Sequence, residues 1–375
     1  MIRLYGHGIG QSSFAQVTRG MQRALTYWSA FAGFFPVDGD PPDSPSGAMA
    51  PVSLNIGAPA GLMTAHRCGG HREHWLLVAP NAQHLPGQFA RKLTEPSKEL
   101  PRGLLDGGLL APSRWAAGVL REAFPGLPVL TAPHGIDPDV YRPDLELRAA
   151  ARRLYDDGEF RVLHMSSTEA DRKGTQLLIE AWRQLRKRRL LPTRATLTIV
   201  MNPLECNRVS WWASSAGNAP EDVIVVPGLA LSPERVVADL YSRAHVVCQP
   251  SRAEGFGMVP LEARACGVPV VATRVTGHSE GHLDGPGVIE IRAREDAPLD
   301  DYPGATAPAV AVEDIIEALV FAVVQWPKLH EAALEQSQFI RGEWTWEKRS
   351  AAAIARLTEG AHEGEGNNGT DRSST

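Results

Sequence analysis

Short apolar runs alternate with amphipathic helical stretches over most of the chain. In the first half, Phe14, Val17, Met21 and Leu25 recur at helical spacing, and Ser113 is a suitable cap for a helix reaching about residue 122. Apolar runs typical of buried strands stand at 2–5, 52–56, 75–79, 109–111 and 128–132. This alternation predicts parallel sheets covered by helices on both faces.

The second half repeats the pattern after a Pro- and Asp-rich stretch, PHGIDPDVYRPDLEL from Pro133, which predicts a hinge. Strands are expected at 161–165, 196–201, 223–226, 245–249 and 269–272, and helices at 175–188, 233–242, 312–324, 328–340 and 347–357. Long loops are expected at 37–51, 203–222 and 293–308. We therefore predict an N-terminal domain over 1–143, a C-terminal domain over 144–344, a last helix at 345–359 that packs back on the first domain, and a disordered tail over 360–375.

Composition narrows the class of protein. With 375 residues and 43% hydrophobic side chains, the chain can bury two cores. Its net charge of -5, from 38 basic and 43 acidic side chains, argues against nucleic acid as a ligand. No apolar run is long enough for a membrane span or a secretory signal. The four cysteines have no paired spacing, which favours buried thiols in a reducing cytoplasm: Cys68, Cys206, Cys248 and Cys266.

The richest segment is SRAEGFGMVPLEARACGVP, which begins at Ser251. A helix is expected over about 258–266, with Pro260 at its first position and Gly267 after its last. The amides and dipole at such a helix start bind phosphate, and the carboxylates of Glu254 and Glu262 can accept hydrogen bonds from sugar hydroxyls. This combination suits a nucleotide diphosphate sugar. The alternative is two glutamates placed near a helix start for the dipole alone.

Two further segments are candidates for anion binding. Arg172 and Lys173 precede a predicted helix, where the dipole disfavours cations, so they indicate either a bound anion or a solvated pair. The loop GHGIGQSS follows the first strand, and its Gly8 and Gly10 would allow a donor phosphate or an acceptor to approach closely, or would form a tight turn. The basic cluster at 183–189 ends a helix, where the dipole explains it; peripheral contact with an anionic membrane is the second interpretation.

Taken in order, four segments resemble the retaining GT-B glycosyltransferases of family 4, the glycosyl transferases group 1. They are LLAPSRWAAGVLREAF from Leu109, PHGIDPDVYRP from Pro133, DRKGTQLLIEAW from Asp171 and QPSRAEGFGMVPLEARACGVPVVAT from Gln249. The resemblance covers most of the C-terminal half and the last third of the N-terminal half. It implies an α/β fold of two Rossmann-like, doubly wound domains facing a central cleft. The implied activity is retaining transfer of a hexose from a UDP- or GDP-sugar to an unidentified hydroxyl on a glycan, lipid, small metabolite or protein.

The resemblance also implies roles for individual residues. Glu262 would hold the ribose, Glu254 the transferred sugar, and Arg172 or Lys173 the departing diphosphate. The remaining donor contacts would come from backbone around Gly257, Met258 and Val259 and, beside the nucleobase, from Gly228 and Leu229. No metal and no other cofactor is implied, because cations and a helix dipole stabilise the leaving group.

The chain departs from the family pattern on the acceptor side and at one cation. Many relatives place an arginine where Thr168 stands, and the acceptor-side stretch offers Asn81 and His84 without a clear counterpart. A second hypothesis is therefore a catalytically weak sugar-nucleotide-binding protein that acts by interaction. A dinucleotide oxidoreductase is disfavoured, because the fingerprint G-x-G-x-x-G is missing.

Overall fold

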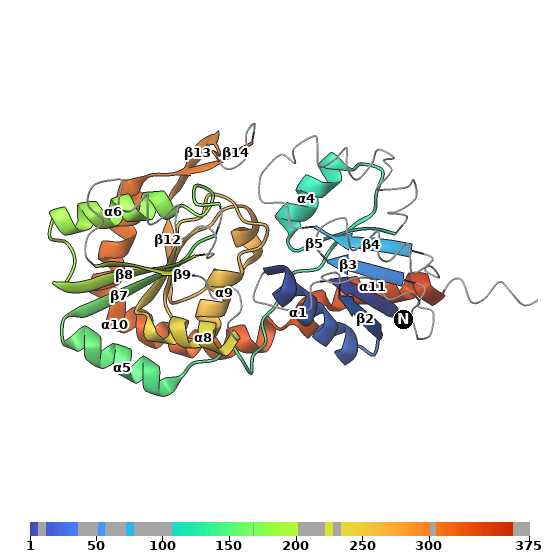
Figure 1. Cartoon of the computed structure of the whole chain (residues 1–375), viewed down its shortest axis with the longest axis horizontal. Helices are drawn as coiled ribbons and strands as arrows, with labels where there is room; N and C mark the ends of the chain where they lie inside the picture. The colour runs from blue at the N-terminus through green and yellow to red at the C-terminus, as the bar shows by residue number, and fades with distance from the viewer. Residues whose placement is uncertain are drawn as a thin grey trace, which may run out of the picture. The chain divides into compact units, whose positions relative to one another are not determined.

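The computed structural model describes residues 1–6, 13–36, 52–56, 73–78, 107–167, 169–201, 222–227, 234–300 and 305–362. They form two compact units, which divide between Gly135 and Ile136 and again between Thr345 and Trp346 (Figure 1). The first division lies ahead of the 143/144 boundary expected from the hinge. The amide of Ile136 donates to the carbonyl of Trp344 at 2.8 Å, which ties this part of the linker to the second unit.

The first unit contains a parallel six-stranded sheet in the order β2-β1-β3-β4-β5-β6. Its strands are β1 (Ile2–Gly6), β2 (Phe31–Pro36), β3 (Val52–Ile56), β4 (Glu73–Leu77), β5 (Gly108–Ala111) and β6 (Val129–Thr131). Every residue of β3 and β5 is buried, as expected for strands covered on both faces. Strand β2 is not anticipated by the sequence pattern.

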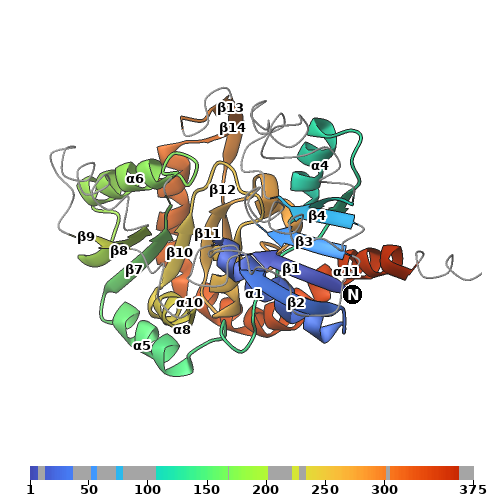
Figure 2. The same cartoon turned by 45° about the vertical axis from the view of Figure 1, so that its right-hand side comes forward.

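Three described helices cover this sheet: α1 (Ser13–Tyr27), α4 (Arg114–Ala123) and the C-terminal α11 (Trp346–His362). Figures 1 and 2 show α4 on one face and α1 and α11 on the other. Ser113 caps α4 as expected, its hydroxyl accepting from the amide of Ala116 at 3.0 Å. Helix α11 is held to α1 by an ion pair between Arg23 and Glu347 and by the Trp28 indole, which donates to the carbonyl of Glu347 at 2.9 Å.

The second unit repeats the scheme around a parallel six-stranded sheet in the order β12-β11-β10-β7-β8-β9. The strands are β7 (Glu159–Met165), β8 (Arg194–Met201), β9 (Val223–Pro227), β10 (Val246–Gln249), β11 (Val270–Thr273) and β12 (Val288–Ile291). The helices are α5 (Leu145–Asp156), α6 (Thr175–Lys187), α8 (Glu234–Arg243), α9 (Met258–Ala265), the short η1 (Thr276–Glu280) and α10 (Val312–Glu343).

Successive residues of the central strands enter different cores. Val162 of β7 packs in one apolar cluster with Trp182 of α6, whereas the next residue, Leu163, packs in another with Leu261 of α9. Side chains alternate between the faces of a strand, so both faces of this sheet are buried. The second unit is therefore doubly wound, and its loops at the carboxyl ends of the parallel strands are the places where ligands bind in such sheets.

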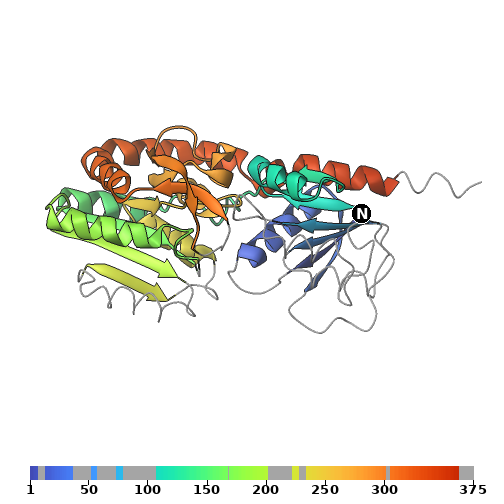
Figure 3. The same cartoon turned by 90° about the horizontal axis from the view of Figure 1, so that it is seen from above.

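Several expected elements differ in the structure. The two helices expected at 312–324 and 328–340 form one continuous helix, α10, with Pro327 inside it (Figure 3). Trp326 is fully buried and its indole donates to the carbonyl of His245 at 2.8 Å. Packing of this kind outweighs the roughly 3 kcal/mol that an interior proline costs a helix.

The expected loop at 293–308 instead contains an antiparallel pair, β13 (Ala293–Pro298) and β14 (Thr306–Val310). Helix α5 and strand β12 are further elements that the pattern does not predict. Helix α11 reaches His362, past the expected start of the tail at 360, and the rest of the tail lies outside the described residues. None of the helices in the described part of the chain combines the length and apolar run needed to cross a bilayer.

Candidate functional site

The glutamate motif forms a turn that opens directly into α9. The helix begins at Met258, so Pro260 stands third and not first, still within the turn where its missing N–H is tolerated. Gly257 caps the helix with φ 96°, and a Cβ there would lie 2.0 Å from the His278 ring. Only glycine fits this position, and it leaves the first amides of α9, including those of Met258 and Val259, without a capping side chain.

Glu254 and the two predicted cations meet in one buried cluster. Lys173 Nζ lies 2.6 Å from Glu254 Oε1, and Arg172 Nη1 lies 3.0 Å from Glu254 Oε2. Ser251 Oγ donates to Glu254 Oε1 at 2.9 Å, while the backbone of Glu254 is held by the Thr276 hydroxyl at 2.8 Å. Glu254, Arg172 and Lys173, which the sequence predicts to serve one site, are thus in direct contact.

The electrostatics of this cluster are those of a tight ion pair. Burial would raise the pKa of Glu254, but the charges of Lys173 and Arg172 outweigh it and hold that pKa well below its usual range. Burial lowers the pKa of Lys173, and the charge of Glu254 only partly offsets this effect. The carboxylate is therefore ionised throughout the physiological range.

The position of Arg172 and Lys173 before α6 is explained by their carboxylate partners. Gly174 caps α6 with φ 67°, and a Cβ there would lie 2.1 Å from the carbonyl oxygen of Pro250, so the two loops touch. The cations then reach Glu254, and Arg172 also pairs with Glu169. The interpretation as a solvated pair is wrong, since Arg172 is 4% exposed.

Glu262 lies apart from the ion-paired cluster. It is on α9, 3% exposed, and its Oε2 accepts from the Tyr241 hydroxyl at 2.7 Å. Its Oε1 is buried and accepts no hydrogen bond of normal geometry, although the Tyr141 hydroxyl interacts with the same carboxylate and lowers its pKa. Burial raises the pKa of Glu262 to about 7, against the opposing effect of the tyrosine hydroxyls. This carboxylate has an open acceptor position, which costs about 1–3 kcal/mol until a donor fills it.

Other candidates cannot be placed, because they lie outside the described residues: Gly8, Gly10, Asn81, His84, Thr168, Gly228 and Leu229. The sequence reasoning did not assign roles to Ser251 and Thr276, although Ser251 begins the quoted motif. Thr276 has φ 48°, a left-handed backbone conformation that a threonine in the sequence does not predict. Within the described ranges, no group of three or more His, Cys, Asp or Glu side chains is arranged for a metal ion. Independence from metal stays a prediction.

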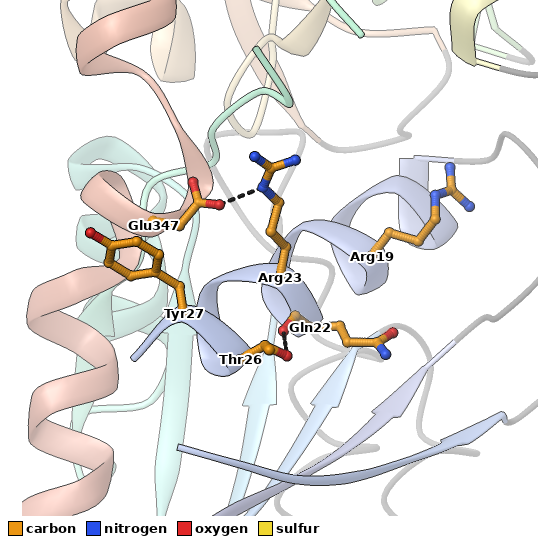
Figure 4. A pocket seen from close by; sticks show the side chains of 6 residues that line it. All are labelled: Arg19, Gln22, Arg23, Thr26, Tyr27 and Glu347. Carbon is orange, nitrogen blue, oxygen red and sulfur yellow. Dashed lines mark hydrogen bonds and ion pairs between the residues drawn. The ribbon is translucent and has the colours of Figure 1, made fainter. Parts of the chain in front are cut away.

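A separate groove of about 490 Å³ lies in the first unit, on α1 beside the start of α11 (Figure 4). Its lining side chains come from Arg19, Gln22, Arg23, Thr26, Tyr27 and Glu347. Figure 4 shows the Arg23 guanidinium directed at Glu347, so that its charge supports the packing of α11. None of its described lining residues is among the predicted donor residues.

Comparison with known proteins gives a family match over the region that holds this cluster. Residues 159–299 match the model of the family described as glycosyl transferases group 1. A GDP-mannose-dependent alpha-(1-6)-phosphatidylinositol monomannoside mannosyltransferase of Mycolicibacterium smegmatis is 32% identical over 64% of this chain and 59% of its own length. A D-inositol 3-phosphate glycosyltransferase of Arthrobacter is 36% identical over 41% of this chain and 36% of its own length. The chain thus matches less than two thirds of each relative.

Solved structures resemble the chain over nearly its whole length. Sucrose-phosphate synthase of Thermosynechococcus elongatus superposes with a TM-score of 0.64 at 14% identity, covering 97% of this chain and 98% of that one. The HepE protein of Anabaena, in complex with UDP and glucose, gives a TM-score of 0.66 at 15% identity, covering 96% of this chain and 100% of the other. At these identities the likeness concerns the fold.

Proposed function

We propose that this protein is a retaining glycosyltransferase that uses a nucleotide diphosphate hexose. It has the GT-B fold, and its residues 159–299 match the glycosyl transferases group 1 family. The names of its relatives support a nucleotide-sugar donor, since one depends on GDP-mannose. A similar fold has been solved with UDP-glucose bound. The acceptor is a hydroxyl compound whose class stays open.

The observation that carries the proposal is the open acceptor position on Glu262. A buried carboxylate oxygen without a partner is unfavourable in a ligand-free protein, and a ribose hydroxyl would satisfy it. Glu262 stands four residues into a helix whose first amides have no capping side chain. Sugar and phosphate binding groups are therefore offered by one element.

The cluster around Glu254 supplies the proposed chemistry. The bond between the anomeric carbon and the diphosphate oxygen breaks as the acceptor oxygen bonds to the same face of that carbon, and the acceptor proton passes to the departing diphosphate. Arg172, Lys173 and the amides of α9 stabilise the developing negative charge. Glu254 accepts from hydroxyls of the hexose, while its ion pairs with both cations hold them beside the donor.

A ligand panel followed by turnover tests the proposal. UDP, GDP and their hexose derivatives are expected to raise the melting temperature, whereas a nicotinamide dinucleotide leaves it unchanged. Donor hydrolysis or transfer is then followed by release of the nucleoside diphosphate, and the anomeric configuration of the product by NMR. An inverted product would refute retention. Nucleotide-sugar binding without turnover of any donor would indicate a binding protein in place of an enzyme.

A further inference from the structure

Arg252 lies in the loop of residues 250–257 between β10 and α9, which we call the glutamate loop. It has no role in the proposed chemistry, yet it is only 7% exposed, and each of its three guanidinium nitrogens donates a hydrogen bond. Its Nη1 donates to both carboxylate oxygens of Asp171, each at 3.0 Å. Its Nη2 donates to the carbonyls of Ala297 at 2.9 Å and Pro298 at 2.8 Å, and Nε to that of Pro308 at 3.3 Å. One side chain therefore joins the glutamate loop to the turn of residues 169–174 before α6, which we call the cation turn, and to both strands of the β13–β14 pair.

The connection between the glutamate loop and the cation turn is reciprocal. Arg172 Nη1, from the cation turn, donates to the carbonyl of Ala253 at 2.8 Å, and the amide of Arg252 donates to the carbonyl of Arg172 at 2.8 Å. Each loop thus sends one arginine across to the other. We call these contacts of Arg252, Asp171, Arg172 and Ala253 the arginine clasp. Lys173 and Glu254 each follow it by one or two residues, so the clasp sets their spacing.

The β13–β14 pair and the residues that connect its strands also contact the clasp. Leu299, Ala305 and Ala307 form a small apolar cluster with Ala253 of the glutamate loop. Asp171 Oδ2 also accepts from the amide of Asp300 at 2.8 Å. In both Figure 1 and Figure 2 the labels of β13 and β14 lie at one end of the second unit, apart from its six-stranded sheet. The β13–β14 pair, which lies outside the main sheet, is therefore bonded to both the glutamate loop and the cation turn.

We propose that Arg252 is a positioning residue of the transfer reaction, which sets the geometry of Glu254, Arg172 and Lys173 through the arginine clasp without touching the donor. This inference rests on the proposed function. A lysine keeps the charge, but its single nitrogen cannot bond both oxygens of Asp171 and three carbonyls at once, as the planar guanidinium does. Misplacement of reacting groups by about 1 Å costs as much as ~100-fold in rate.

The test is Arg252→Lys beside a matched control on the same strand pair. Arg294 of β13 also forms a two-pronged pair, with Asp314 at 2.8 and 3.1 Å, but on the exposed side. We expect Arg252→Lys to lower kcat about 10- to 100-fold with little change in the KM for donor, because the proposed ground-state contacts at Glu262 and the first amides of α9 lie outside the clasp. Arg294→Lys leaves both constants unchanged. Equal kcat values for the two variants would overturn the proposal.

A measurement that needs no turnover separates failure of this inference from failure of the proposed function. Competitive acylation followed by mass spectrometry reports the accessibility of Lys173 relative to the exposed Lys328 on α10. Arg252→Lys is expected to raise the labelling of Lys173 several-fold, and Arg294→Lys to leave it unchanged. Unchanged labelling in Arg252→Lys refutes the clasp even where the wild-type protein turns over no donor.

Asp171→Asn provides a second route to the same result, since it removes the acceptor charge and leaves Arg252 in place. We expect it to reproduce the loss in kcat, and the double variant to lose little more than either single one, because both act on one interaction. Additive losses would contradict a shared role. Should Arg252→Lys fail to fold, judged by circular dichroism, Asp171→Asn decides the question by the same labelling and kinetics.

Discussion

At the scale of residues, the two motif glutamates have opposite electrostatic environments. Glu254 is surrounded by cations that lower its pKa, whereas Glu262 is buried beside tyrosine hydroxyls and its pKa is raised to about 7. The spacing of the motif alone does not distinguish them. Glu254 therefore stays ionised over the physiological range, whereas Glu262 can gain or lose a proton near neutral pH.

Glu262 therefore predicts a pH dependence of nucleotide binding. In the proposed complex, ribose hydroxyls donate to the charged carboxylate, so they lower its pKa and binding releases a proton. Affinity for a UDP- or GDP-hexose, whose esterified diphosphate does not titrate in this range, should rise as pH increases toward about 7 and level off above it, by up to ~10-fold for each unit of pKa shift. Calorimetric titration in buffers of different ionisation enthalpy measures the released proton. Glu262→Gln should abolish the dependence, and proton uptake in the wild type would contradict this account.

Lys173 is predicted to contribute mainly to the transition state. Lys173→Ala removes one of the two cations proposed to face the departing diphosphate, and loss of one such group typically costs on the order of 10²–10³ in kcat. Steady-state kinetics with the best donor of the ligand panel measures the loss. Lys187→Ala, at the exposed far end of α6, is the matched control and should behave as wild type. Wild-type kcat in Lys173→Ala would remove the assigned role.

At the scale of elements, the start of α9 depends on Gly257. A Cβ at φ 96° is strained and would overlap the His278 ring, so the turn must move if alanine stands there. We expect Gly257→Ala to lower the melting temperature and to weaken nucleoside diphosphate binding at least 10-fold, measured by calorimetry. Gly342→Ala, in α10 with open space around it, is the control and should leave binding intact. Normal binding by Gly257→Ala would argue against anion binding at this turn.

Elements with a local signal could be predicted from the sequence. The apolar residues at 52–56 predict strand β3, and Ser113 predicts the start of α4 because its hydroxyl can cap a helix. The β13–β14 pair could not, because half of AREDAP is charged and the side chain that bonds to its backbone, Arg252, stands more than forty residues earlier. The arginine clasp could not be predicted either, because its hydrogen bonds join segments that are far apart in the sequence. Motif spacing located Glu254, Arg172 and Lys173 but not the contacts that orient them.

At the scale of the whole molecule, the chain builds two separate cores and returns to the first at its end. Trp346, at the start of α11, is 4% exposed and lies against α1 so closely that a Cβ on Gly20 would be 2.0 Å from its ring. Trp326 of α10 is fully buried in the second unit. These two tryptophans allow each core to be perturbed by itself.

Two unfolding transitions are therefore expected in scanning calorimetry, one for each core. Trp346→Ala should lower the first-unit transition and Trp326→Ala the second-unit transition, each by about 3–5 kcal/mol in free energy of unfolding. Phe339→Ala, whose ring is 57% exposed on α10, should shift neither. Nucleoside diphosphate should raise the second-unit transition alone, because Glu262, Lys173 and α9 all belong to it. If the nucleotide instead raised the melting temperature of the first-unit transition, which Trp346→Ala lowers, the donor site would lie in the first unit and the proposed site would be wrong.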